Sequence, residues 1–153
     1  MRVVSFDFDS TLSDTRHRQH KIDRVNGTDW AAYGLMCVDD PVGPAYPLAK
    51  FFSDYNIPWI IVSGRAEEAR AVSEAWLEKY ELYPVQIFLS DHRHAGMDHA
   101  AWKALRLQQI QKKHGFEIAF HVEDMSSVAV AAEAIGIPTM LVHPIGVLED
   151  SFG

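Results

Sequence analysis

Cysteine is almost absent from this sequence of 153 residues, in which Cys37 stands alone. One thiol cannot form an internal disulfide, which excludes a disulfide-stapled mini-protein and is typical of a protein in the reducing cytoplasm. Long apolar runs are also lacking, since the longest, residues 57–62, has six residues. A membrane-spanning helix needs about 20, and a secretory signal needs a longer acid-free apolar stretch than the first residues provide. We therefore expect a cytoplasmic protein with neither a membrane-spanning helix nor a secretory signal.

Positive charge is scarce as well. The 14 Lys and Arg residues are outnumbered by 21 Asp and Glu residues, which gives a net charge of −7. Proteins that bind long duplex DNA across a whole surface are usually basic, so we expect any contact with nucleic acid to be local. The apolar share of 48% is enough for a sizeable core, and the length fits one domain over residues 1–153.

Short apolar runs alternate with helical patterns along the chain. The runs are rich in Val, Ile and Phe and almost continuously apolar, which is typical of parallel strands covered on both faces. They are residues 2–7, 57–62, 85–89, 118–122 and 138–142. Apolar residues at helical spacing occupy residues 48–55, 69–80, 99–114 and 128–135. This alternation predicts a doubly wound, Rossmann-like α/β fold, with five parallel strands and helices on both faces of the sheet.

Residues 10–40 do not follow the alternation. They contain a basic, histidine-rich stretch from Arg16 to Arg24 and a short helical pattern at residues 29–36. A connection of this length in a compact domain is usually functional, so we expect a minimal lid, or flap, after the first strand. Its cations fit either a solvated lid surface or a clamp for a phosphate backbone.

Two aspartates, Asp7 and Asp9, come at the end of the first predicted strand. Side chains alternate along a strand, so both carboxylates are expected on the same side, where they repel one another. Mg²⁺ would compensate this repulsion, because it prefers carboxylate and phosphate oxygens. The alternative is an Asp pair that makes a turn and caps a helix.

Polar residues also follow the second and fourth predicted strands. Ser63, Gly64 and Arg65 supply a hydroxyl, a close backbone approach and a cation before a helix N-terminus, a combination that binds anions. They are equally compatible with an ordinary strand-to-helix turn. Glu123 and Asp124 follow the fourth strand, where the alternative role of Asp124 is to cap the next helix.

Lys103 lies near the start of the helix predicted over residues 99–114. That helix runs antiparallel to the strands, so its first turn is expected at the edge where the strands end. Ligands of open α/β sheets bind at this edge. A solvated surface lysine is the alternative, but the coincidence of acids, a hydroxyl and a lysine at one edge favours a common site.

Four motifs in this order resemble those of the haloacid dehalogenase superfamily of phosphohydrolases. They are Asp7-x-Asp9-x-Thr11, Ser63, Lys103 and Glu123-Asp124. Within that superfamily the chain is similar to the 3′-phosphatase domain of polynucleotide kinase/phosphatase enzymes. This second similarity rests on His17-Arg18, Val62-Ser63-Gly64-Arg65, Trp76-Leu77 and the spacing to Lys103.

The chain departs from that phosphatase group at two positions. Ser10 stands where glycine is more usual, and Leu89-Ser90 stands where an arginine is more usual, with Arg93 as a candidate substitute. No G-x-x-x-x-G-K-[ST] phosphate loop occurs in the sequence, so no kinase half is expected.

The resemblance implies a Mg²⁺-dependent phosphomonoesterase in which Asp7 attacks phosphorus and forms an aspartyl-phosphate. It implies that Asp9 protonates the leaving alcohol, then activates water, and contributes its backbone carbonyl to the metal. Lys103 and Ser63 would bind the phosphoryl oxygens. Asp124 would complete the metal ligands with Asp7 and Asp9, and Glu123 would support them.

The expected substrate is a phosphorylated molecule, foremost the 3′-phosphate of a nucleic-acid end. Residues expected to contact the substrate or to orient Asp7 are Thr11, Gly64, Arg65, Arg18 and Arg93. Two alternatives stay open: a 5′(3′)-nucleotidase or other small-molecule phosphatase of the superfamily, and a catalytically silent module that binds a phosphorylated ligand. Retention of Asp7, Asp9, Lys103 and Asp124 together disfavours the silent module, since binding alone does not need both acids.

Overall fold

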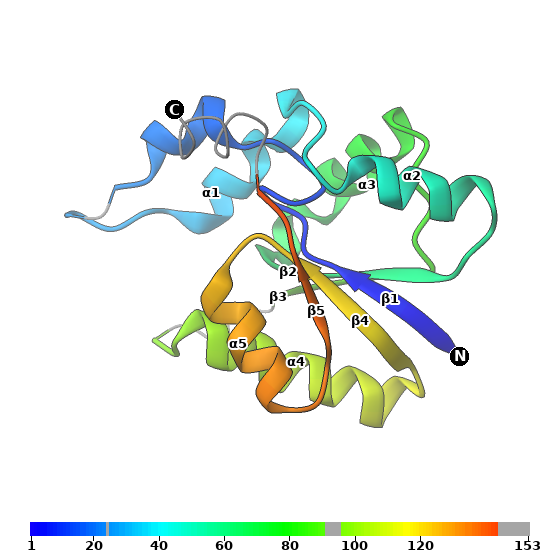
Figure 1. Ribbon diagram of the computed structural model, residues 1–153. Coiled ribbons are helices and arrows are strands. Elements are labelled where there is room, and N and C mark those ends of the chain that lie inside the picture. Colours follow the sequence, from blue (N-terminus) through cyan, green and yellow to red (C-terminus); the bar gives the residue numbers. More distant parts are fainter. Residues whose placement is uncertain (24, 91–95, 144–153) are drawn as a thin grey trace, which may run out of the picture.

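A five-stranded, all-parallel sheet forms the centre of the computed structural model, which describes residues 1–23, 25–90 and 96–143 (Figure 1). The strand order is β3-β2-β1-β4-β5. The strands are β1 (Arg2–Phe6), β2 (Trp59–Ala66), β3 (Gln86–Ser90), β4 (Glu117–Glu123) and β5 (Thr139–Leu141). The predicted Rossmann-like α/β fold with five parallel strands is confirmed.

Helices cover both faces of the sheet, as predicted. In Figure 1, α2 (Tyr46–Asp54) and α3 (Arg70–Lys79) lie on one side, and α4 (His99–His114) and α5 (Ser126–Ala134) on the other. The bounds of α4 match the predicted 99–114. Its first turn is capped by the Asp98 carboxylate, which accepts from the Ala101 N–H at 3.0 Å, and it ends at Gly115 with φ 69°.

Two hydrophobic clusters hold the layers together. Alternate side chains of β1 enter opposite clusters, so that Val4 and Phe6 pack toward α2 and α3 while Val3 packs toward α4 and α5. Phe6 meets Trp59 edge-to-face at 5.2 Å between ring centroids. Each such buried side chain stabilises the fold by about 1.5–3 kcal/mol. This packing fixes the positions at which β1, β2 and β4 end.

Residues 10–23 and 25–40 lie beyond the carboxyl ends of the strands (Figure 1). They contain two short 3-10 helices, η1 (Arg16–Lys21) and η2 (Met36–Asp39), and α1 (Trp30–Leu35), close to the helix predicted over 29–36. Buried Leu12, Tyr33 and Cys37 anchor the segment to the core.

Gly43 closes this segment against the turn after β1. Its N–H donates to the Leu12 carbonyl at 2.7 Å. A Cβ at this position would lie 2.7 Å from the carbonyl oxygens of both Thr11 and Ser13, closer than real Cβ atoms approach. Only glycine therefore allows this contact between the two backbones.

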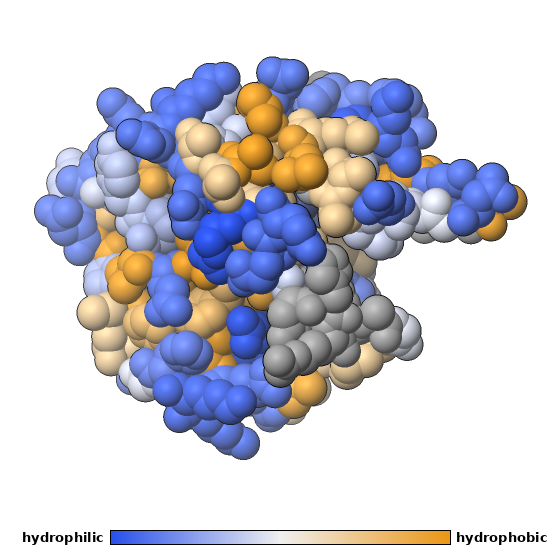
Figure 2. Space-filling view, turned by 180° about the vertical axis from the view of Figure 1, so that it is seen from behind, coloured by the Kyte–Doolittle hydropathy of each residue, from blue (hydrophilic) through white to orange (hydrophobic). Residues whose placement is uncertain are grey.

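The surface is mixed in character. Figure 2 shows one face, on which hydrophobic atoms form separate groups among hydrophilic ones. Leu35, Met36 and Val38 are among the apolar side chains with more than 40% of their surface exposed. Within the described ranges, every helix is too short or too polar to cross a membrane.

Candidate active site

The Asp7 carboxylate is held at both of its oxygens. Asp7 follows β1 directly and is 7% exposed, and its N–H donates to the Val122 carbonyl of β4 at 2.9 Å. The Lys103 ammonium donates to Oδ1 at 2.9 Å, and the Thr11 hydroxyl donates to Oδ2 at 3.1 Å. The Asp7 side chain is thus oriented by two donors, one four residues away in the sequence and the other 96 residues away.

Three acids converge where β1 and β4 end. Carboxyl oxygens of Asp7, Glu123 and Asp124 all lie within 4.8 Å of one another. At about 4 Å and an effective dielectric constant near 20, each pair of ionised carboxylates repels by about 4 kcal/mol. Burial, together with the charge of Asp7, raises the pKa of Asp124 to about 9. Burial, together with Glu123, also raises the pKa of Asp7.

This donor set suits a hard divalent cation. Mg²⁺ takes oxygen ligands, typically one or two carboxylates together with substrate phosphate and water. Asp7 and Asp124 supply two carboxylates, and burial and neighbouring acids raise the pKa of both. A cation between them would offset this repulsion. The residues present therefore fit Mg²⁺.

Asp124 does not cap the following helix. The N-cap residue of α5 is Met125, and no side chain caps that end of the helix. Asp124 Oδ1 instead lies 3.4 Å from the hydroxyl of Thr11, the residue that donates to Asp7, so its carboxyl group is beside Asp7. Of the two roles considered for Asp124, the structure excludes the cap.

Lys103 is fully buried between two acids. Its Nζ lies 2.9 Å from Asp7 Oδ1 and 3.6 Å from Glu123 Oε1. Although burial disfavours the charged form, the attraction of Asp7 and Glu123 raises the pKa of Lys103. Burial likewise opposes the ionisation of Glu123, but Lys103 and a hydrogen bond from His121 lower its pKa. The surface-lysine alternative for Lys103 is wrong, because the side chain has no exposed surface.

A buried chain of polar side chains lies behind Lys103. The Ser5 hydroxyl is 2.8 Å from His121 Nδ1, and His121 Nε2 is 3.1 Å from Glu123 Oε1. Neither Ser5 nor His121 has exposed surface. The sequence analysis missed both residues, and the signal for them was a histidine in an otherwise apolar strand.

Asp9 is not part of the acidic cluster. The strand alternation that placed it beside Asp7 stops at Phe6, where β1 ends, and a tight turn follows in which the N–H groups of residues 11–13 donate to the Phe8 carbonyl. Arg65 Nη2 donates to Asp9 Oδ1 at 2.7 Å, and Arg18 Nη2 donates to the same oxygen at 2.8 Å. Burial opposes ionisation, but attraction to Arg65 and Arg18 lowers the pKa of Asp9.

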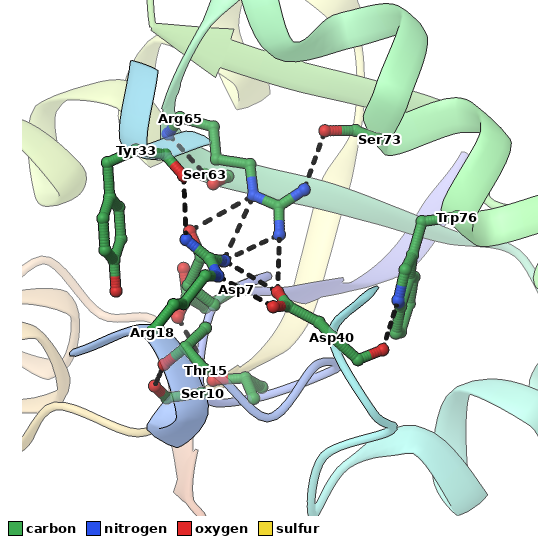
Figure 3. Close-up of polar contacts among 12 residues, drawn as sticks. Asp7, Ser10, Thr15, Arg18, Tyr33, Asp40, Ser63, Arg65, Ser73 and Trp76 are labelled. Carbon is green, nitrogen blue, oxygen red and sulfur yellow. Dashed lines mark hydrogen bonds and ion pairs between the residues drawn. The ribbon is translucent and has the colours of Figure 1, made fainter. Parts of the chain in front are cut away.

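The two arginines are themselves enclosed (Figure 3). Arg18 donates through Nε and Nη2 to the two oxygens of Asp40, at 2.7 Å each, and through Nη1 to the Tyr33 carbonyl at 3.0 Å. Arg65 donates to the Ser73 hydroxyl at 2.8 Å, and its guanidinium lies 3.6 Å from the centre of the Phe8 ring. Arg18 and Arg65 are only 3% and 4% exposed.

Arg18 and Arg65 therefore contact acids, whereas the sequence analysis expected them to contact substrate. Asp40, which joins this network with no exposed surface, was not anticipated. It accepts from Arg18 in the bidentate geometry that makes Arg–carboxylate pairs strong. His17 Nε2 lies 2.7 Å from Asp40 Oδ1, so the His17-Arg18 pair of the motif meets one carboxylate.

Ser63 and Gly64 lie within a strand, not at a helix start. β2 continues to Ala66, and the 3-10 helix η3 (Glu67–Ala69) separates it from α3. The pairing of β2 with β3 shifts register between Val62 and Ala66, which makes this stretch irregular. Ser63 is buried, and its Oγ accepts from the Arg65 N–H at 3.1 Å.

Two further positions bear on the motifs. Gly64 allows the first turn of α4 to approach, because a Cβ there would lie 3.0 Å from His99 Cε1. Ser10 has φ 64°, the left-handed conformation that glycine adopts without strain, and its hydroxyl is 2.7 Å from the Thr15 hydroxyl. Arg93 lies outside the described residues.

Comparisons with known proteins give structural matches only. No protein-family model matches the sequence, and a comparison with curated proteins finds no match. Two solved structures of the Pnkp1/Rnl/Hen1 RNA repair complex contain similar chains, each with a TM-score of 0.67 over 92% of this chain, at 22% and 17% identity. The chain spans 45% and 42% of those proteins, less than half of their length.

Two phosphatases are also similar in structure. D,D-heptose 1.7-bisphosphate phosphatase from B. bronchiseptica, complexed with magnesium and phosphate, has a TM-score of 0.63 and 13% identity over 100% of this chain and 87% of its own. Class C acid phosphatase from Bacillus anthracis with tungstate bound has a TM-score of 0.62 and 14% identity over 94% of this chain and 67% of its own. The chain therefore shares its fold with these phosphatases, as the resemblance of its motifs predicts.

Proposed function

We propose that this chain is a Mg²⁺-dependent phosphomonoesterase that forms an aspartyl-phosphate and removes the 3′-phosphate from nucleic-acid ends. The observation that carries the proposal is the Asp7 carboxylate, which Lys103 and Thr11 hold at 2.9 and 3.1 Å beside Glu123 and Asp124. A nucleophilic carboxylate must be fixed and must have its charge offset, and these neighbours do both.

In the first step an Asp7 oxygen bonds to phosphorus while the bond from phosphorus to the leaving alcohol breaks. Lys103, already at Asp7 Oδ1, offsets the negative charge on the phosphoryl oxygens, and the Ser63 hydroxyl is proposed to bind them as well. Asp7 and Asp124 would hold Mg²⁺, with Glu123 in support and the Asp9 carbonyl as a further ligand. When bound, Mg²⁺ neutralises the repulsion between the carboxylate and the phosphate.

Asp9 is assigned to proton transfer. The attraction of Arg18 and Arg65 favours its carboxylate form, which accepts a proton from water during hydrolysis of the aspartyl-phosphate. Protonation of the leaving alcohol in the first step requires the Asp9 side chain to take up a proton and turn from the arginines toward Asp7. In this mechanism Arg18 and Arg65 hold the ionised Asp9, and they release the side chain when it takes up a proton.

The substrate class is proposed from likeness in sequence and in structure. It is supported by the similarity of His17-Arg18 and of residues 62–65 to 3′-phosphatase domains, and by the structural likeness to chains of an RNA repair complex. Structural likeness to a heptose bisphosphate phosphatase and an acid phosphatase supports the second candidate, a nucleotidase or other small-molecule phosphatase.

Phosphate release from a panel of substrates tests the proposal. The panel contains an aryl phosphate, 3′- and 5′-mononucleotides, and oligonucleotides phosphorylated at either end, each with Mg²⁺ and with EDTA. We expect the highest kcat/KM for the 3′-phosphorylated oligonucleotide in Mg²⁺, and no phosphate release from any substrate in EDTA. Equal or better hydrolysis of mononucleotides would favour the second candidate. If the protein binds these substrates but releases no phosphate, the catalytically silent binding module would be favoured.

A further inference from the structure

A groove lies along α4 beside the edge strand β3, outside the acidic cluster. Its volume is about 210 Å³, and the side chains that line it include Ser90, Met97, Trp102, Arg106, Gln109 and Lys113. Among the described residues that line it there are two cations and no acid, in a chain whose net charge is −7. The described lining of the groove therefore has a charge opposite in sign to that of the chain as a whole.

The spacing of these residues follows one face of the helix. Trp102, Arg106, Gln109 and Lys113 are three or four residues apart, which places them in a row along α4. The row begins next to Lys103, whose ammonium contacts Asp7. Trp102 also reaches the other side of the site, since its Cζ3 lies 3.9 Å from where a Cβ on Gly64 would be. The near end of the groove, at Trp102, thus lies beside Gly64, the neighbour of Ser63.

The two cations of the groove are not engaged by acids. The Arg106 guanidinium lies 5.4 Å from the centre of the Phe88 ring, and within residues 1–23, 25–90 and 96–143 neither Arg106 nor Lys113 forms an ion pair. This contrasts with Arg18 and Arg65, which share Asp9. Arg106 and Lys113 remain able to bind an anionic partner.

We propose that this groove binds a single nucleic-acid strand on the 5′ side of the terminal 3′-phosphate, with its backbone phosphates on Arg106 and Lys113. The inference rests on the proposed function, which places the terminal phosphate at Asp7. Arg106 and Lys113 are about 10 Å apart along the helix axis. A stacked strand advances about 3.4 Å per phosphate, so the two cations are separated by about three phosphate steps of a strand that lies along the groove.

We expect a strand as the occupant because Arg106 and Lys113 lie in one row along α4, and this row begins next to Lys103. Met97, with 45% of its surface exposed, and the edge of Trp102 offer apolar contact for bases at the near end of the groove. A mononucleotide fills only the phosphate site and does not reach Arg106 or Lys113.

The test is the double variant Arg106→Gln/Lys113→Gln, with Lys112→Gln as the matched control. Lys112 is an exposed lysine on the same helix that does not line the groove. For a 3′-phosphorylated tetranucleotide we expect the double variant to raise KM about tenfold at low salt and to reduce the slope of log KM against log salt by about 1.4, for two lost contacts. Hydrolysis of an aryl phosphate should be unchanged.

Binding measured without turnover separates this inference from the proposed function. The probe is the tetranucleotide with a 5′ fluorophore, followed by fluorescence anisotropy in EDTA. Weaker binding by the double variant than by Lys112→Gln supports the groove even if no substrate is hydrolysed. If the two variants have equal KM values and equal binding affinities for the tetranucleotide, the groove proposal is wrong, whereas the proposed phosphatase function is unaffected. If the double variant loses as much activity on the aryl phosphate as on the tetranucleotide, the groove proposal is also wrong. It is wrong as well if polyglutamate competes for the probe as strongly as an unphosphorylated oligonucleotide does.

Discussion

The stability of the metal-free protein should fall as pH rises through neutrality, because three acids share one buried space. Burial and the charge of Asp7 raise the pKa of Asp124 from 3.8 to about 9. Between these values the folded protein holds a proton that the unfolded chain has lost, so the free energy of unfolding decreases as pH rises. Glu123 acts in the opposite sense, but only below its ordinary pKa of 4.5, because its folded-state pKa is lowered.

The expected size follows from one proton. The contribution of Asp124 is at most about 1.4 kcal/mol per pH unit, which for a domain of this length corresponds to roughly 3–5 °C in melting temperature. Mg²⁺ needs ionised carboxylates and displaces this proton, so its apparent affinity should rise by up to about tenfold per pH unit. The stabilisation by Mg²⁺ should therefore grow with pH.

Thermal unfolding in EDTA and in excess Mg²⁺, measured between about pH 6 and 8, checks this expectation. The difference in melting temperature should widen with pH in the wild type. Asp124→Asn has the same shape without the proton, so it should melt higher than the wild type in EDTA at the upper pH and lose the widening. Asp39→Asn, an exposed acid on η2, is the control. A constant difference across pH, or a widening kept by Asp124→Asn, would refute the reasoning.

Three other substitutions have definite expected outcomes. Asp7→Asn should remove aryl phosphatase activity while the protein stays folded by circular dichroism, since an amide keeps the shape but is a poor nucleophile; activity in the folded variant would exclude Asp7 as nucleophile. Arg65→Gln should lower the free energy of unfolding in urea by about 3–5 kcal/mol, because it breaks a buried ion pair, whereas Arg16→Gln, at an exposed pair, should change little. Gly43→Ala should destabilise by about 1–3 kcal/mol and lower kcat, because its Cβ displaces the Thr11 backbone.

The fold was predictable because local and long-range requirements agree. Strands covered on both faces must be apolar throughout, and the predicted runs match β1 to β5 within a few residues. The exception is β2, which was expected to end at Val62. It continues to Ala66 because Ala66 pairs with Ser90 of β3, and the pattern of β2 alone does not contain that contact.

The site was predictable where it depends on strand order alone. β1 and β4 are neighbours, so the residues that follow them, Asp7 and Asp124, meet. The position of Asp9 was not predictable from alternation, because β1 ends before it. Asp40 and His121 were missed because their partners, Arg18 and Ser5, lie 22 and 116 residues away and nothing local indicates these pairs.

The use of the cations changes the argument for a polyanionic substrate. From the sequence, Arg18, Arg65 and Arg93 were expected to contact the substrate. Of these, Arg18 and Arg65 lie among the described residues. Both are buried and form ion pairs with Asp9, so their charge stabilises the ionised form of Asp9 and is not available to a ligand. If a nucleic-acid strand gains affinity beyond its terminal phosphate, Arg106 and Lys113, on the same helix as Lys103, are cations that can supply it. Catalysis and strand binding then share α4, since Lys103 faces Asp7 while Arg106 and Lys113 face the groove.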